Sequence, residues 1–299
     1  MEANKIILND EVLIDLSEDT ATEEDVLEGK TFHKADGTQA VGTGKGGGGG
    51  GDEFPADKYF EGGYAEVNLP NATKIKDRAF YYDTALVNVN MPKATSIGGS
   101  AFYNCSNFVN IEMPMVTSIS SNAFMSCSNL ALTSLPEGLT SIGGSAFCSC
   151  RKLALTSLPK GVTFSGGNVF ENCSSLALTS LPKGVTSIGG YLFNGCSSLA
   201  LTSLPEGLTS IANNAFADCS SLALTSLPER LTSIGGYAFN NCVGLTSITF
   251  KGKPSTIHSS AFSGCTSLTT INVPWSEGEV SGAPWGATNA TIIYNYTGE

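Results

Sequence analysis

The chain has few charged residues, and basic ones are the scarcer. Only 14% of its 299 residues are charged, and 16 Lys and Arg stand against 27 Asp and Glu, for a formal charge of −11. Residues 1–45 hold 11 of the acids and 4 of the bases, a net −7 that leaves −4 for the rest. This acidic balance argues against a phosphate-backbone partner, so we expect no nucleic-acid binding.

Long apolar runs are also missing. None approaches the roughly 18 residues of a membrane-spanning helix, and residues 1–10 lack the apolar core and cleavage site of a signal peptide. We therefore expect no membrane insertion and no export signal. The 34 glycines and 12 prolines interrupt helical patterns, whereas 41% hydrophobic residues suffice for a packed core. These features predict a mainly β chain of short strands and turns.

Histidine is nearly absent, which limits the chemistry available. The two histidines, His33 and His258, have no metal-ligating or catalytic partner nearby in sequence. The Gly-Gly pairs are not followed by a lysine and a long helix, as a phosphate-binding loop requires. Carboxylates occur about once per repeat at changing positions and form no acid–base pair. We expect neither enzymatic activity nor a metal or cofactor.

What the sequence does contain is a repeat with a period of 22–23 residues. One phenylalanine marks each of nine copies, and a cysteine follows it by three residues in all but the first copy, which has Asp83. The phenylalanines are Phe80, Phe102, Phe124, Phe147, Phe170, Phe193, Phe216, Phe239 and Phe262. The cysteines are Cys105, Cys127, Cys150, Cys173, Cys196, Cys219, Cys242 and Cys265.

An isoleucine stands five residues before each phenylalanine except in one copy. There Ser165 takes its place and Phe164 comes just before it. We predict a locally rearranged layer in which the Phe164 ring fills the missing isoleucine's volume.

Between each cysteine and the next isoleucine lies a short apolar stretch that ends in proline in most copies, such as Leu130–Pro136. Ten copies start at Tyr64, Leu86, Phe108, Leu130, Leu153, Leu176, Leu199, Leu222, Leu245 and Leu268. Alternation and the terminal proline predict a short strand in each. A unit this small cannot bury its own faces, so the copies must stack into a solenoid.

Stacking would place the cysteines in a buried column, one per layer. No thiol in such a column has a unique partner, so we expect reduced, structural cysteines, which fits folding in a reducing cytoplasm. Cys148 lies outside the column, at a position that varies among copies, and we predict an exposed, adventitious thiol there.

The pattern Cys-x-x-Leu…Leu-Pro-x-Gly-Leu-Thr-Ser-Ile-Gly-Gly-x-Ala-Phe-x-x-Cys, over about residues 64–273, resembles the BspA-like (Treponema-type) leucine-rich repeats. The resemblance implies a leucine-rich-repeat solenoid, and known members are surface proteins implicated in adhesion; similar arrays occur in phage-derived proteins. The five middle copies depart from the pattern by an extra leucine. Either a bulge turns these leucines inward, which we favour, or they form an outer apolar stripe: Leu132, Leu155, Leu178, Leu201 and Leu224.

Residues 1–43 lie outside the repeat and predict a small α+β module. Lys5–Leu8 and 12–16 suggest two strands joined at Asn9-Asp10, Thr22–Asp25 could cap a short helix, and 34–37 indicates a turn. The run 25–38 resembles a module of tail-associated phage and prophage proteins. Residues 44–52, which contain six consecutive glycines, predict a flexible linker.

After the repeat array of residues 53–272, residues 273–299 leave the period and contain both tryptophans. A solenoid needs its last apolar layer covered, so we predict a C-terminal cap that ends in a strand at Thr291–Tyr296. Trp275 and Trp285 pack in that cap or, alternatively, offer faces for sugar rings.

Together these features favour a phage or prophage tail fibre or receptor-binding protein. Residues 1–43 would attach to other virion tail proteins, and the solenoid would bind a host cell-surface glycan or protein. Analogy with attachment fibres suggests a homotrimer. The alternatives are a BspA-like adhesin on the bacterial cell surface, which would require export, and a passive structural spacer, which the near-identity of the middle copies would suit.

Overall fold

The computed structural model describes residues 65–298 in full and, before them, the backbone of four short strands. Strand β1 (Lys5–Leu8) pairs antiparallel with β2 (Glu11–Asp15), and β3 (Thr31–His33) pairs antiparallel with β4 (Gln39–Val41). The β1–β2 pairing confirms the predicted pair of strands around Asn9-Asp10. The predicted helix cap at 22–25, the turn at 34–37 and the linker at 44–52 lie outside the described residues.

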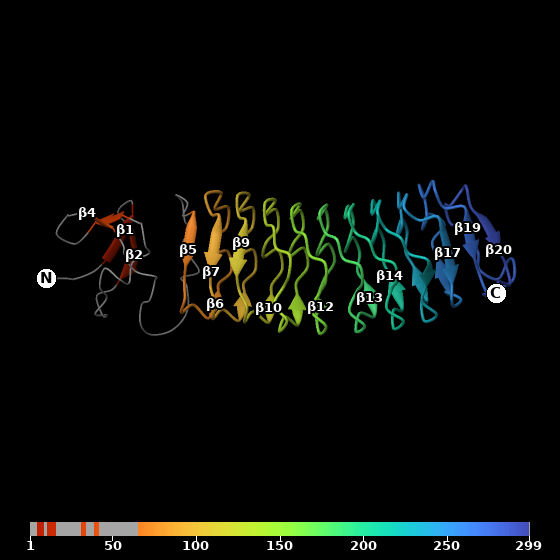
Figure 1. Cartoon of the computed structure of the whole chain (residues 1–299), viewed down its shortest axis with the longest axis horizontal. Coiled ribbons are helices and arrows are strands. Elements are labelled where there is room, and N and C mark those ends of the chain that lie inside the picture. Colours follow the sequence, from red (N-terminus) through yellow and green to blue (C-terminus); the bar gives the residue numbers. More distant parts are fainter. Residues whose placement is uncertain (1–4, 9–10, 16–30, 34–38, 42–64, 299) are drawn as a thin grey trace.

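Residues 65–298 form an elongated parallel β-solenoid whose coils follow one another along a single axis (Figure 1). The predicted fold class is confirmed, and no helix occurs in this stretch. Each complete coil has two strand positions joined by turns. The first position carries β5 (Glu66–Asn68), β7 (Asn88–Asn90), β9 (Asn110–Glu112), β15 (Ser226–Leu227), β17 (Ser247–Phe250), β19 (Thr270–Asn272) and β20 (Thr291–Ile293).

The second strand position holds the isoleucine column. Its two-residue strands, which the sequence analysis did not predict, are β6 (Lys74–Ile75), β8 (Ser96–Ile97), β10 (Ser118–Ile119), β11 (Ser141–Ile142), β12 (Thr163–Phe164), β13 (Ser187–Ile188), β14 (Ser210–Ile211), β16 (Ser233–Ile234) and β18 (Thr256–Ile257). In most of these pairs serine faces outward and isoleucine faces the core, where its side chain is buried. Two residues are enough because each coil needs only to place one branched side chain inside.

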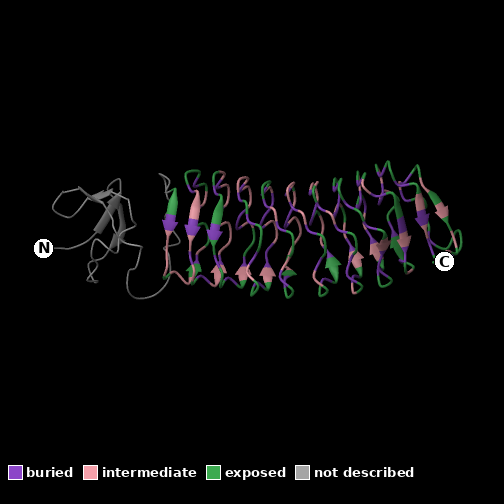
Figure 2. Ribbon diagram, in the orientation of Figure 1, coloured by how far each residue is buried: buried purple, intermediate pink, exposed green. Residues whose placement is uncertain are grey.

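The core is one continuous cluster of buried apolar side chains enclosed by the coils. Buried and exposed positions alternate along each coil (Figure 2). The core contains the stack of phenylalanine rings from Phe80 to Phe262. Successive ring centroids lie 5.0 to 5.7 Å apart, and the planes are nearly parallel. The phenylalanine column predicted from the 22–23-residue period is confirmed.

The middle copies differ from the prediction at the first strand position. At this position no strand forms within residues 130–223. One backbone hydrogen bond per layer joins neighbouring coils at this position, such as Ala154 N to Leu132 O at 3.0 Å. The extra leucines do turn inward, as favoured, and each is 7% exposed or less. In these copies the inward residues are spaced by two and then three, as at Leu130, Leu132 and Leu135. In the first four of these copies the Thr-Ser pair lies outside any ladder, whereas in the fifth copy Ser226 pairs with Thr249 of β17.

The solenoid is also interrupted where the isoleucine is missing. Phe164 pairs with Ile142 in β11, half-buried, with its ring edge-on to Phe170 at 6.0 Å. It thus takes the isoleucine's position in the ladder. Its ring is half-buried, so it fills the isoleucine's volume less completely than predicted. The next layer does not continue the sheet: β12 ends one sheet and β13 begins another. The bond from Thr163 N to Thr140 O has no counterpart between Thr186 and Thr163.

Residues 273–298 cover the last coil. Strand β20 pairs in parallel with β19, and it spans the first part of the predicted strand at 291–296. The Lys253 ammonium donates to the Glu279 carboxylate, and this contact lowers the pKa of Glu279. The boundaries predicted for the module, linker, solenoid and cap stay predictions.

Candidate functional site

The cysteine column is built by hydrogen bonds between layers. Each thiol from Cys105 to Cys265 donates to the carbonyl oxygen of the phenylalanine one layer earlier, at 2.8 to 3.1 Å. All nine cysteines are free and buried. Because cysteine is small and can donate one hydrogen bond, it satisfies a buried carbonyl without a cavity or an unpaired polar group.

Burial raises the pKa of the seven column thiols from Cys127 to Cys265 above the ordinary range of a thiol. The direction is upward for Cys127 through Cys242, and burial raises the pKa of Cys265 to about 11. A protonated, enclosed thiol is a poor nucleophile and a poor metal ligand. The column is therefore structural rather than reactive.

The prediction of an exposed Cys148 is wrong. Its side chain is 6% exposed, with Sγ 3.7 Å from a carboxylate oxygen of Glu171, and burial raises the pKa of the thiol. Its position in the repeat is half-buried in most layers, as at Tyr103 and Met125. Half-buried positions tolerate several residue types, so variation among copies was not a sign of exposure.

The tryptophans are enclosed in the C-terminal cap. Trp275 is 3% exposed and Trp285 is 0% exposed, and their ring centroids are 6.4 Å apart. Trp285 Nε1 donates to Ser281 O at 2.9 Å. Neither ring offers a free face to a sugar, so the structure supports cap packing rather than the alternative of a carbohydrate platform.

His258, the histidine within residues 65–298, belongs to no metal or catalytic cluster there. His258 is exposed on the last coil, where its Nδ1 lies 2.8 Å from Ser260 Oγ. The side chain of His33 lies outside the described residues. Within residues 65–298 no group of three or more His, Cys, Asp or Glu side chains is arranged to hold a metal ion.

The outward surface at the first strand position is small, polar and regular. In the middle copies it presents Thr-Ser pairs: Thr133 and Ser134, Thr156 and Ser157, Thr179 and Ser180, Thr202 and Ser203, and Thr225 and Ser226. Towards the N-terminal end the same surface carries asparagine, and Asn90 Nδ2 donates to Asn68 Oδ1 at 3.0 Å. This surface can donate and accept hydrogen bonds along the solenoid.

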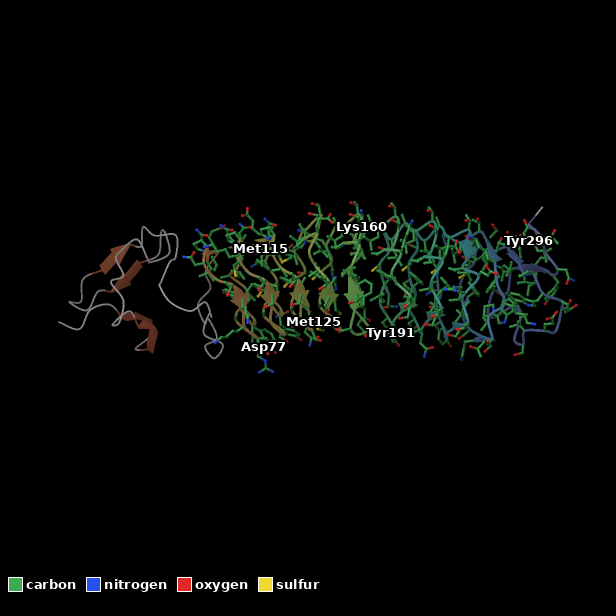
Figure 3. All side chains as sticks on the ribbon, turned by 90° about the horizontal axis from the view of Figure 1, so that it is seen from below. Asp77, Met115, Met125, Lys160, Tyr191 and Tyr296 are labelled. Atoms are coloured by element: carbon green, nitrogen blue, oxygen red, sulfur yellow. The ribbon has the colours of Figure 1, made fainter. Side chains whose placement is uncertain are left out.

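Exposed tyrosines mark the opposite, turn-lined edge, and the sequence analysis did not single them out. Tyr82, Tyr191 and Tyr237 are 52%, 41% and 49% exposed, and all three have a left-handed backbone, with φ of 61°, 56° and 57°. Figure 3 shows Tyr191 on the same long edge as Asp77 and Met125, across the solenoid from Met115 and Lys160. The available signal was a tyrosine where other copies have serine or asparagine.

The fold and the stacked columns define a leucine-rich-repeat solenoid protein. The BspA type leucine-rich repeat region matches residues 59–177 and 166–282, so the chain belongs to this family. The predicted resemblance to BspA-like repeats is confirmed. A search of curated proteins finds no match.

The chain is similar to solved leucine-rich repeat structures. A leucine-rich repeat protein from Bacteroides ovatus is 24% identical, over 81% of this chain and 68% of that one, with a TM-score of 0.56. The T. pallidum leucine-rich repeat protein is 30% identical over 57% of this chain and 76% of that one, with a TM-score of 0.44. A leucine-rich cell surface protein from Faecalibacterium prausnitzii is 22% identical over 87% and 97%, with a TM-score of 0.31. Neither the family match nor the Bacteroides ovatus structure supports the tail-fibre hypothesis.

Within the described residues, no helix has the length and apolar character required to cross a membrane.

Proposed function

We propose that the chain is a non-catalytic attachment protein that acts at a bacterial cell surface. The observation that carries the proposal is the contrast between interior and exterior in residues 65–298. The thiols and tryptophans are buried, whereas the exterior repeats the same small polar groups from layer to layer. A stacked array of this kind suits binding of an extended partner, either a cell-surface glycan or a protein. Known surface members of the BspA-like repeats support the location.

Localisation tests the proposal directly. An antibody against residues 53–299 should deposit immunogold on the envelope of intact cells of the source strain, and a deletion mutant should remain unlabelled. Adhesion of the mutant to its target surface should fall and should recover when the full chain is supplied. Gold confined to the cell interior would refute a surface role.

A second candidate, the tail fibre, is favoured by the resemblance of residues 25–38 to tail-associated proteins. In this version residues 1–43 attach to virion proteins, and the fibre is a homotrimer. Immunogold label on the tail tips of induced phage particles, with no label on the cell envelope, would favour the tail fibre over the adhesin. Deleting residues 1–43 should then abolish incorporation into particles, and a truncated chain that still co-sediments with virions would exclude this anchor.

A further inference from the structure

Two exposed tyrosines occupy a backbone position that disfavours them. The residue two before the column phenylalanine has a left-handed φ in every layer from Arg78 to Tyr237. Small residues take this position in most layers, namely Ser100, Asn122, Ser145, Asn168 and Asn214, but Tyr191 and Tyr237 carry large rings there. A bulky side chain at positive φ is strained, and a ring left nearly half exposed recovers little of that strain through burial.

The two tyrosines belong to one column, with Asn214 between them. Tyr191 N donates to Asn213 O at 3.1 Å, and one layer later Asn214 N donates to Gly236 O at 3.0 Å. The phenylalanine rings of these layers stack at 5.5 and 5.4 Å. Since the tyrosines stand two layers apart with the same backbone conformation, their Cα–Cβ bonds leave the solenoid on the same side, about 10 Å apart.

Neither aromatic stacking nor hydrogen bonding accounts for these side chains. Among residues 65–298, neither tyrosine ring makes an aromatic contact, and neither hydroxyl forms a hydrogen bond. The side-chain amide of Asn214 also has no hydrogen-bond partner there. The three turns, 189–191, 212–214 and 235–237, contain no charged residue and are otherwise glycine, alanine and asparagine. The surface thus offers two aromatic faces, with an unpaired amide between them.

We propose that Tyr191, Asn214 and Tyr237 bind a neutral glycan chain, a proposal that rests on the attachment function above. The apolar face of a sugar ring can stack on each tyrosine, and the Asn214 amide can donate to and accept from sugar hydroxyls between them. A chain of linked sugar rings presents such faces repeatedly along its length, as the column does. The absence of charge in the three turns favours a neutral sugar polymer over an acidic one.

A protein partner fits this edge less well. Stable protein interfaces bury about 800 Å² on each side and surround their aromatic anchors with residues that exclude water. Here two glycines precede each tyrosine, and no leucine, methionine or arginine lies in the three turns. Two separated rings beside one amide suit the narrow contact of a single polymer strand.

The repeat supplies its own test variant. Asparagine stands at this column position in other layers and tolerates positive φ, so the double variant Y191N/Y237N should fold at least as well as the parent chain. The matched control is Tyr82→Asn. Tyr82 is also an exposed tyrosine with positive φ, it lies near the first repeat, and Asn104 takes its position in the next layer.

Affinity electrophoresis of the full chain measures the binding. The gels contain hydroxyethyl cellulose, xylan, mixed-linkage β-glucan, galactomannan or yeast mannan. At least one polymer should retard the parent chain, the double variant should bind it about tenfold more weakly, and Y82N should match the parent. Asn214→Ala should give an intermediate loss. No retardation by any polymer, or equal retardation of parent and double variant, would overturn the proposal.

A second readout separates this proposal from the attachment function. Surface gold and adhesion that persist in Y191N/Y237N would leave the attachment protein standing and reject the tyrosine site. Retardation that requires both tyrosines, together with gold only inside the cell, would keep the glycan site and reject surface attachment. Adhesion that survives enzymatic removal of glycans from the target surface would point to a protein partner and count against the site.

Discussion

We call the side with the phenylalanine and cysteine columns the turn side, and the side with the second strand position the sheet side. The two sides respond differently to the irregular copy at residues 163–188. The phenylalanine stack and the thiol-to-carbonyl hydrogen bonds continue through this copy. The ring centroids of Phe170 and Phe193 are 5.7 Å apart, and Cys196 Sγ donates to Phe170 O. The sheet side loses its ladder between β12 and β13, a gap visible in Figure 1. The buried side-chain columns therefore hold successive coils together even where a backbone ladder is missing.

The largest test of this comparison is alkaline unfolding. Burial raises the pKa of the seven column thiols from Cys127 to Cys265, so the folded state keeps its protons where the unfolded chain has lost them. The stability that these groups contribute is therefore full below about pH 8.5 and is lost as the pH rises past it. Each thiol adds up to about 1.4 kcal/mol per pH unit to the decline in unfolding free energy.

Urea denaturation between pH 7 and pH 10 measures that decline. Cys219→Ala removes one titrating group, so its curve should fall less steeply with pH. A midpoint that stays constant up to pH 10 would show that the thiols do not ionise on unfolding, against the buried column.

Removing one ring from the phenylalanine stack should cause the next largest loss of stability. Phe216→Ala leaves a cavity between two fixed rings and should lower the unfolding free energy by about 3–5 kcal/mol. On the sheet side, Ile211→Val should lower it by only about 0.5–1.5 kcal/mol. Chemical denaturation of both variants compares the two sides, and equal losses would contradict the larger contribution expected of the turn side.

Repairing the irregular copy should stabilise the chain modestly. The double variant F164S/S165I restores the Thr-Ser-Ile sequence of the neighbouring copies. A buried isoleucine and a restored ladder should add about 1–2 kcal/mol to the unfolding free energy. Hydrogen exchange at the amides of residues 186–189 should slow. Destabilisation would mean that the contact between Phe164 and Phe170 outweighs the missing ladder.

The smallest predicted effect distinguishes the two cap tryptophans. Trp275 Nε1 is buried without a hydrogen-bond partner, so Trp275→Phe removes an unsatisfied donor. Trp285→Phe instead leaves the Ser281 carbonyl without its donor. The second variant should be less stable by about 1 kcal/mol, as measured by thermal unfolding. The reverse order would indicate a partner for Trp275 Nε1.

Sequence reasoning succeeded wherever a residue recurs at a constant step. The phenylalanine column, the buried cysteines and the displaced Phe164 all follow from spacing, because one residue per coil must project to the same place in every layer. It failed where the environment of a position had to be judged from residue type. Cys148 is buried despite its variable position, and four of the five middle copies lack the predicted strand, which forms in the fifth, beside the regular strand β17.

The candidate site was the least predictable part. The tryptophans attracted attention as aromatic residues outside the repeat, yet they fill the cap. Tyr191 and Tyr237 were overlooked because a tyrosine inside a repeat resembles ordinary variation. What distinguishes these two tyrosines is a positive φ angle and an exposed side chain. Neither property can be read from the residue type at one position.

The amino-acid sequence alone was enough to establish the period, and through it the solenoid, its inward columns and its family. Stacking of identical units leaves few other ways to bury their apolar sides. The folded structure was needed to show which outward residues are strained or exposed, and where the sheets break. Those properties depend on contacts between neighbouring coils, so a local pattern of residue types does not contain them.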